Sequence, residues 1–245
     1  MRCYDYAFRI EPKFFISAPF GNYIKSKKCI SVTGTWTLNS RGNRLWAVIK
    51  TLRYNIDNKG WTNKLGLPNP GINVGLRKTS TTEVLSIAEV DRNDFYKLNK
   101  LIPSNQNIEL NLSCPNLDKI LSWETANIFK HDSRDWCIAK MSPLTTPEEL
   151  EFVIDRIGFR QIHFSNTLST KYGGQSGPIL KDYTLKLIEL VRDEWKDEVE
   201  IIAGGGVENF DDILNYLKMG ADHISIGSVC FNPLKLRKLL TKLQY

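Results

Sequence analysis

Short apolar segments rich in β-branched residues recur along the chain and predict eight β-strands. Several of them are apolar at nearly every position, as expected for strands that are covered on both faces. The predicted strands are residues 14–18, 29–34, 84–88, 108–112, 137–141, 161–165, 200–203 and 223–226.

Helical patterns alternate with these segments from the third strand onward. Thr146 precedes a proline and two glutamates, which is the pattern expected at a helix N-terminus. Residues 209–220 run from a capping asparagine to a terminal glycine, and residues 182–196 and 233–243 also have helical periodicity. Alternating strands and helices with eight strands are typical of a closed parallel barrel or of a doubly wound sheet. We predict the first of these, an α/β (β/α)8 TIM barrel.

Two segments depart from this alternation. Residues 19–28 separate the first two strands and are too few for a full crossover helix. Residues 41–76 hold glycine, proline and asparagine clusters with few helical signals. We expect this segment to be an irregular insertion or a small hairpin layer over the carboxyl-terminal face of the barrel. The chain has no internal repeat and no linker composition, so we predict a single domain over residues 1–245.

Composition limits the class of protein. Of the 245 residues, 42% are hydrophobic and 24% are charged, which excludes wholesale disorder. No apolar run approaches the ~20 residues that span a bilayer, and the first residues lack the apolar segment of a signal peptide. We therefore expect a cytoplasmic protein with no membrane partner. The net charge of +6 permits an anionic partner, but the basic stretches 25–28 and 235–242 lack interleaved aromatic residues, so we predict no nucleic-acid partner.

One of the five cysteines is a candidate for chemistry. No spacing among Cys3, Cys29, Cys114, Cys137 and Cys230 is typical of a zinc site or a disulfide framework, and we predict no catalytic metal. Four of them lie in apolar or strand-like surroundings and are expected to be small buried residues. Cys114 differs because it directly follows a predicted strand. With an ordinary thiol pKa of about 8.5, it could act as a general base on a carbon acid.

Glycines end the two last predicted strands. In a parallel barrel these strands are neighbours, and their ends are the usual place for a phosphate group. Glycine lets backbone N–H groups approach an anion closely, and a helix follows each of the two strands. Gly205, Gly206, Gly227 and Ser228 therefore predict a phosphate site, with tight turns as the alternative.

Further polar residues end the neighbouring strands. Lys140 lies at a strand end, where a lysine is costly to bury unless it meets an anion. A flavin ring that gains negative charge on reduction would be such an anion. The carboxamides of Asn63, Asn111, Asn116 and Asn166 can each donate and accept hydrogen bonds, which suits the edge of a uracil-like ring. His163 lies inside a predicted strand, and we interpret it as a core residue.

Several blocks of the sequence, in order, resemble the dihydroorotate dehydrogenase family, in its soluble class that uses a cysteine as the base. The most specific block is Glu-Leu-Asn-Leu-Ser-Cys-Pro-Asn at residues 109–116. The other similar blocks are residues 32–38, 63–69, 139–143, 164–167, 173–178, 201–207 and 226–228.

The resemblance implies an FMN-containing barrel that oxidises dihydroorotate to orotate in pyrimidine biosynthesis. It implies that Cys114 removes the C5 proton while the C6 hydride passes to flavin N5. The implied substrate-binding residues are Asn63, Gly66, Leu67, Asn111, Asn116, Asn166 and Thr167. The implied cofactor-binding residues are Ala18, Pro19, Gly34, Thr35, Asn111, Lys140, Ser165, Gly177, Gly205, Gly206, Gly227 and Ser228. The resembling class further suggests a soluble electron acceptor such as fumarate, and a homodimer.

One departure from the family pattern bears on the substrate. Gly34 stands where the family has a lysine that touches both substrate and flavin. The loss of this cation removes a charged hydrogen bond to the orotate carboxylate, worth about 1.5–3 kcal/mol, unless Lys64 or Arg44 replaces it. Two alternatives therefore stay open. One is an FMN oxidoreductase acting on another ene or pyrimidine substrate, such as dihydrouridine in tRNA, and the other is a non-catalytic flavin-binding barrel.

Overall fold

Eight parallel strands close into a barrel in the computed structural model, which describes residues 10–112 and 123–243. The strand order around the barrel is β1-β12-β11-β8-β7-β6-β5-β2. Their bounds are β1 Phe14–Ile16, β2 Ile30–Trp36, β5 Val84–Ile87, β6 Ile108–Asn111, β7 Cys137–Lys140, β8 Gln161–Phe164, β11 Glu200–Ala203 and β12 His223–Ile226. All eight strands correspond to segments predicted from the sequence, and the (β/α)8 TIM barrel is confirmed.

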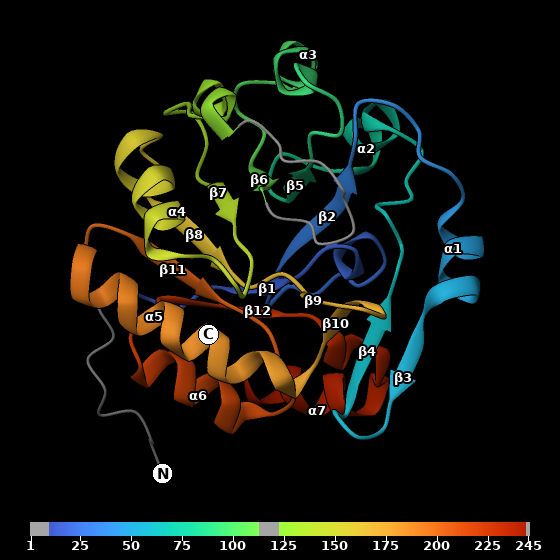
Figure 1. Cartoon of the computed structure of the whole chain (residues 1–245), viewed down its shortest axis with the longest axis vertical. Coiled ribbons are helices and arrows are strands. Elements are labelled where there is room, and N and C mark those ends of the chain that lie inside the picture. Colours follow the sequence, from blue (N-terminus) through green and yellow to red (C-terminus); the bar gives the residue numbers. More distant parts are fainter. Residues whose placement is uncertain (1–9, 113–122, 244–245) are drawn as a thin grey trace.

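Helices surround the barrel, as Figure 1 shows. They are α1 Arg44–Thr51, α2 Ile72–Lys78, α3 Asp94–Leu101, α4 Pro147–Glu151, α5 Lys181–Trp195, α6 Phe210–Lys218 and α7 Pro233–Lys242, with a π-helical turn at Phe152–Arg156. The caps expected from the sequence are present. Thr146 forms a capping box with Glu149 at α4, and Asn209 forms one with Asp212 at α6. In the described ranges, no helix is both long and apolar enough to cross a bilayer.

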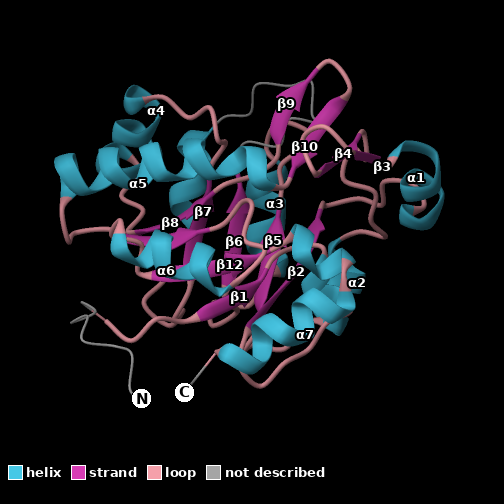
Figure 2. Ribbon diagram, turned by 90° about the horizontal axis from the view of Figure 1, so that it is seen from below, coloured by secondary structure: helices cyan, strands magenta, loops and turns pink. Residues whose placement is uncertain are grey.

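A second, smaller sheet covers one end of the barrel (Figure 2). It has the order β3-β4-β10-β9, from Arg53–Asn55, Gly60–Asn63, Gly173–Ser176 and Leu168–Thr170. The hairpin layer expected within residues 41–76 is therefore present as β3 and β4. The same segment also holds α1 and the start of α2, which the sequence pattern did not predict. Only a short 3-10 turn, Phe20–Asn22, joins β1 to β2, in agreement with the missing crossover helix. Further 3-10 turns lie at Trp123–Phe129, Pro178–Leu180 and Ser228–Phe231.

The interior of the barrel has an apolar floor with a polar layer above it. Phe15, Val32, Val84, Ile138 and Ile202 form a buried cluster separate from the main core beneath the helices. Because side chains alternate between the two faces of a strand, the next inward position lies two residues further along. On β7 this step leads from Ile138 to Lys140, at the carboxyl end of the strand. The polar layer therefore lies at the end of the barrel where these folds hold their active sites.

Candidate active site

A cavity of about 400 Å³ opens at the carboxyl ends of the barrel strands. Residues from the ends of β1, β7, β8, β11 and β12, from the small sheet and from α1 form its wall. The lining residues that the sequence predicted are Ala18, Pro19, Asn63, Lys140, Ser165, Asn166, Thr167, Gly177, Gly205, Gly206, Gly227 and Ser228. The fold thus brings most of the predicted substrate and cofactor residues to one cavity.

Glycines from two strand ends and one loop form one part of the cavity wall. Gly205 and Gly206 follow β11 with φ values of 83° and 74°, a region that favours glycine. A Cβ added at Gly206 would lie 2.7 Å from Lys181 Cγ and 3.0 Å from the Gly177 carbonyl oxygen. At Gly227, by contrast, an added Cβ would meet only Ser17, at 3.7 Å, because it would point into open space. The glycines therefore shape a cradle that side chains would fill or distort.

The cradle is held from below by α6. Tyr216, buried on this helix, donates a hydrogen bond from its hydroxyl to the Gly205 carbonyl oxygen at 2.5 Å. Burial raises the pKa of Tyr216, so its hydroxyl keeps its proton and remains a donor. The helix thereby fixes the backbone of the first cradle glycine.

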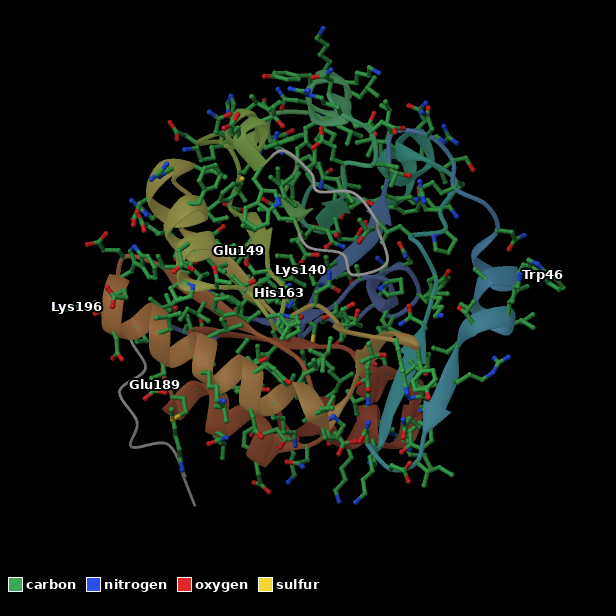
Figure 3. All side chains as sticks on the ribbon, in the orientation of Figure 1. Trp46, Lys140, Glu149, His163, Glu189 and Lys196 are labelled. Carbon is green, nitrogen blue, oxygen red and sulfur yellow. The ribbon has the colours of Figure 1, made fainter. Side chains whose placement is uncertain are left out.

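A buried ion pair forms the floor of the cavity. Lys140 is 6% exposed, and its Nζ lies 3.5 Å from Oε1 of Glu109, which is fully buried on the neighbouring strand β6. The other carboxylate oxygen lies 2.6 Å from Nδ1 of His163 on β8. Figure 3 shows Lys140 and His163 beside each other near the centre of the barrel. The expectation that His163 is a core residue agrees with its burial, although it takes part in a polar cluster.

The charges of this cluster follow from its environment. Burial raises the pKa of Glu109, but the Lys140 ammonium, His163 and the Ser86 hydroxyl together lower it to about 2. Burial and the nearby Lys140 lower the pKa of His163, against the opposite effect of Glu109. Near neutral pH the carboxylate is therefore ionised and the imidazole is neutral.

The two described barrel asparagines are joined to each other. Nδ2 of Asn166 donates to Oδ1 of Asn111 at 2.8 Å, and Oδ1 of Asn166 accepts from the backbone N–H of Thr167 at 2.9 Å. Asn166 and Thr167 line the cavity directly, whereas Asn111 is 4% exposed and stands behind them. Asn63 reaches the same cavity from β4 of the small sheet.

Besides Asn111, four predicted site residues do not line the cavity. Gly34 and Thr35 lie behind it on β2, and Gly66 and Leu67 lie in the loop after β4. The Gly66 carbonyl accepts from Arg41, and the neighbouring Leu65 takes the place at the wall. Cys114 and Asn116 lie outside the described residues, so their roles stay predictions.

The backbone at Gly34 leaves no room for a side chain. Its φ is 104°, and a Cβ added to it would lie 2.5 Å from the Ser86 carbonyl oxygen. A side chain does not fit this conformation. Among the described residues that line the cavity, Lys140 has the one charged side chain, and it is already paired with Glu109.

An apolar wall was missed by the sequence reasoning. It comprises Phe20, Tyr23, Leu45, Val48, Leu52, Trp61, Leu180 and Phe231. The capping asparagine Asn43, which accepts from the N–H groups of Leu45 and Trp46, is the signal that could have located α1. Trp46 on the same helix is 67% exposed and points away from the barrel (Figure 3).

The described cysteines and acidic residues form neither a reactive thiolate nor a metal centre. Burial raises the pKa of Cys29 and Cys137 to about 11 and that of Cys230 to about 12, so all three remain thiols. Over residues 10–112 and 123–243, no group of three or more His, Cys, Asp or Glu side chains is arranged to hold a metal ion.

Comparisons with known proteins agree on one family. The family model described as "Dihydroorotate dehydrogenase" matches residues 150–244. The protein named "Dihydroorotate dehydrogenase B (NAD(+)), catalytic subunit" of Endomicrobium trichonymphae is 30% identical over 230 residues, which cover 80% of this chain and 72% of that protein. The protein of the same name from Staphylococcus carnosus is 28% identical over 218 residues, which cover 75% of this chain and 71% of that protein.

A solved structure shows the same fold. The dihydroorotate dehydrogenase of Eimeria tenella in complex with ferulenol superposes with a TM-score of 0.74 at 17% identity, covering 94% of this chain and 80% of that one. None of these names supports fumarate as the electron acceptor, since the curated relatives are named for NAD(+).

Proposed function

This chain belongs to the dihydroorotate dehydrogenase family, and from this premise we propose that it binds FMN and oxidises dihydroorotate to orotate. One observation carries the proposal. The glycine cradle, Lys140 and the carboxamide residues Asn63 and Asn166 line a single cavity at the carboxyl end of the barrel. These are the group types that a phosphate, a flavin ring and a pyrimidine require.

The described residues fit FMN. The cradle at Gly205, Gly206 and Gly227 leaves room for a phosphate. Because these residues have no side chain, their backbone N–H groups can come close to the phosphate oxygens. Lys140 would face the flavin ring, where its ammonium stabilises negative charge. FMN would supply the hydride acceptor.

The chain's own residues would bind and deprotonate the substrate. Asn166 and Thr167, with Asn111 behind them, would bind one edge of the pyrimidine. Asn63 and Asn116 would bind another edge. The role of base falls to Cys114 through the family resemblance. A positioned base of this kind contributes roughly 10²–10⁴-fold to the rate.

Electrons would leave through a second subunit to NAD(+). The relatives' names, with "NAD(+)" and "catalytic subunit", support this choice and replace the earlier expectation of fumarate. We also propose that the chain forms a homodimer, which light scattering of the purified protein would test.

Anaerobic reduction tests the activity. The purified protein should be yellow, and dihydroorotate should bleach the flavin absorbance. A Cys114→Ala variant should retain the flavin and lose most turnover. Colourless protein that does not take up FMN would contradict the cofactor, and full turnover in the variant would contradict the base.

A second substrate class has its own support. Among the described residues that line the cavity, no cation other than Lys140 is present for the carboxylate of dihydroorotate. An FMN oxidoreductase acting on a pyrimidine without that carboxylate is therefore the second candidate. Dihydrouracil is the matched probe, because it lacks only the carboxylate. Bleaching by dihydrouracil but not by dihydroorotate would favour the second candidate.

A further inference from the structure

A continuous line of hydrogen bonds joins the buried carboxylate of Glu109 to the residues of the cavity wall. Its first links are the hydroxyls of Ser86 and Thr35, here called the hydroxyl pair. Ser86 Oγ lies 2.8 Å from Glu109 Oε1 and 3.1 Å from Thr35 Oγ1. Its next links are the carboxamides of Asn111 and Asn166, here called the amide pair. Asn111 Nδ2 lies 3.3 Å from Thr35 Oγ1, and the amide pair is joined at 2.8 Å.

The carboxylate gives this line a direction. An ionised carboxylate can only accept, so Ser86 must donate its single proton to Glu109. Thr35 must then donate to Ser86, which leaves the Thr35 oxygen as the acceptor for an N–H of Asn111. This turns the Asn111 oxygen toward Asn166, whose Nδ2 becomes the donor. The carboxylate thereby sets the direction of the line from one end, three hydrogen bonds from Asn111 and four from Asn166. The backbone N–H of Thr167, which donates to Oδ1 of Asn166, sets the same direction from the other end.

The Glu109 carboxylate also contacts two residues outside this line, Lys140 and His163. Its Oε1 lies 3.5 Å from the Lys140 ammonium, and its Oε2 lies 2.6 Å from Nδ1 of the neutral His163. One buried charge is therefore shared between the flavin-facing lysine and the line to the amides. Charged hydrogen bonds inside a protein hold their partners more firmly than neutral ones do.

We propose that Glu109 is a positioning residue that serves both halves of the active site. Through the hydroxyl pair it holds Asn111 from one end of the line, in the orientation toward a pyrimidine that the Thr167 N–H favours from the other end. By direct contact it holds the Lys140 ammonium and partly neutralises it. The identities of the two ligands rest on the proposed function, whereas the direction of the line does not.

Two variants separate the two roles. Thr35→Val removes the hydroxyl that accepts the hydrogen bond from Asn111 Nδ2 but leaves Glu109 and Lys140 in contact. Glu109→Gln removes the charge but keeps an oxygen that can accept from Ser86. Thr33→Val is the matched control, because this residue lies on the same strand and both partners of its buried hydroxyl, the Thr79 hydroxyl and Nε1 of Trp36, lie outside the line.

The quantities to measure are the Kd for orotate of the FMN-loaded protein and the Kd values for oxidised and for reduced FMN. In Thr35→Val the Kd for orotate should rise at least tenfold, while the ratio of the Kd of oxidised FMN to that of reduced FMN should stay at the wild-type value. In Glu109→Gln, orotate binding should stay within about threefold. The ratio of the Kd of oxidised FMN to that of reduced FMN should rise at least tenfold, about 30 mV for a two-electron couple. The reason is that the lysine charge is no longer offset. Thr33→Val should change neither quantity.

Side-chain NMR of the FMN-free protein tests the line without either ligand. The side-chain N–H signals of Asn111 and Asn166 should shift in Thr35→Val and not in Thr33→Val. Unchanged signals, or wild-type orotate binding in Thr35→Val, would overturn the role toward the amides. If the ratio of the Kd of oxidised FMN to that of reduced FMN is unchanged or lower in Glu109→Gln, the proposed role of Glu109 toward Lys140 is wrong. A wild-type protein that binds neither FMN nor orotate, but shows the NMR shifts, would contradict the proposed function and leave the line supported.

Discussion

Replacing Lys140 by methionine tests how strongly the buried ion pair stabilises the fold. Methionine keeps an unbranched apolar stem but leaves the Glu109 carboxylate without its cation. Burial raises the pKa of Glu109, yet Lys140, His163 and Ser86 bring it from an ordinary 4.5 to about 2. At 1.36 kcal/mol per pKa unit, this corresponds to about 3 kcal/mol of stability at pH 7. Breaking a buried pair by removing one partner typically costs about 3–5 kcal/mol. We therefore expect Lys140→Met to lower the free energy of unfolding by about 3 kcal/mol.

This loss has a definite dependence on pH. A carboxyl group with a lowered folded-state pKa stabilises the fold fully above its unfolded pKa, and this stabilisation disappears as the pH falls through the folded value. For Glu109 the window runs from about 4.5 down to about 2. In Lys140→Met the pKa of Glu109 rises, because only His163 and Ser86 then oppose the effect of burial. The difference in stability between wild type and variant should therefore narrow as the pH falls.

Guanidinium denaturation of the FMN-free protein at pH 7, 5 and 4 measures the effect. Lys181→Met is the control, since the Lys181–Asp212 pair is partly exposed and should contribute less than about 1 kcal/mol. The double variant Glu109→Gln/Lys140→Met should lose less than the two single variants combined. A loss below about 1 kcal/mol at pH 7, or one that grows toward pH 4, would refute the reasoning.

Three further outcomes are expected. Tyr216→Phe leaves the Gly205 carbonyl without its donor and should cost about 1–3 kcal/mol, measured by thermal unfolding of the FMN-free protein. Gly206→Ala places a Cβ 2.7 Å from Lys181 Cγ at a φ of 74°, so FMN affinity should fall at least tenfold while circular dichroism stays unchanged. Burial raises the pKa of Cys137 to about 11, so with the other cysteines replaced by serine it should react with a thiol reagent at pH 8 roughly 100-fold more slowly in the native than in the unfolded protein.

The barrel could be predicted because its strands are covered on both faces. In the sequence such strands are short runs of apolar residues, and each of the eight runs forms a barrel strand. Helix α1 could not be predicted in the same way. Its residues Leu45, Trp46 and Ile49 are all more than half exposed, so the helix lacks the buried stripe that gives a helix its sequence period.

The site was predictable at strand ends and not within strands. Cavity residues such as Asn166 and Gly206 stand just after a strand, where chemistry in a parallel barrel is expected. Glu109 stands inside β6, and its partners come from β5, β7 and β8. These contacts depend on how the barrel closes, and no pattern local to residues 109–116 specifies them.

The location of the buried charges is nevertheless related to a local pattern. A carboxylate and an ammonium inside a barrel reduce stability relative to apolar residues of the same size, so a packed interior without a ligand would exclude them. Here the lower interior layer is apolar, with Phe15, Val32, Val84, Ile138 and Ile202. On β7, the inward position after Ile138 is Lys140, whose side chain lines the cavity. An inward position that changes from apolar to ionisable at the last pleat of a barrel strand therefore marks a site, because only a group bound above it makes the buried charge useful.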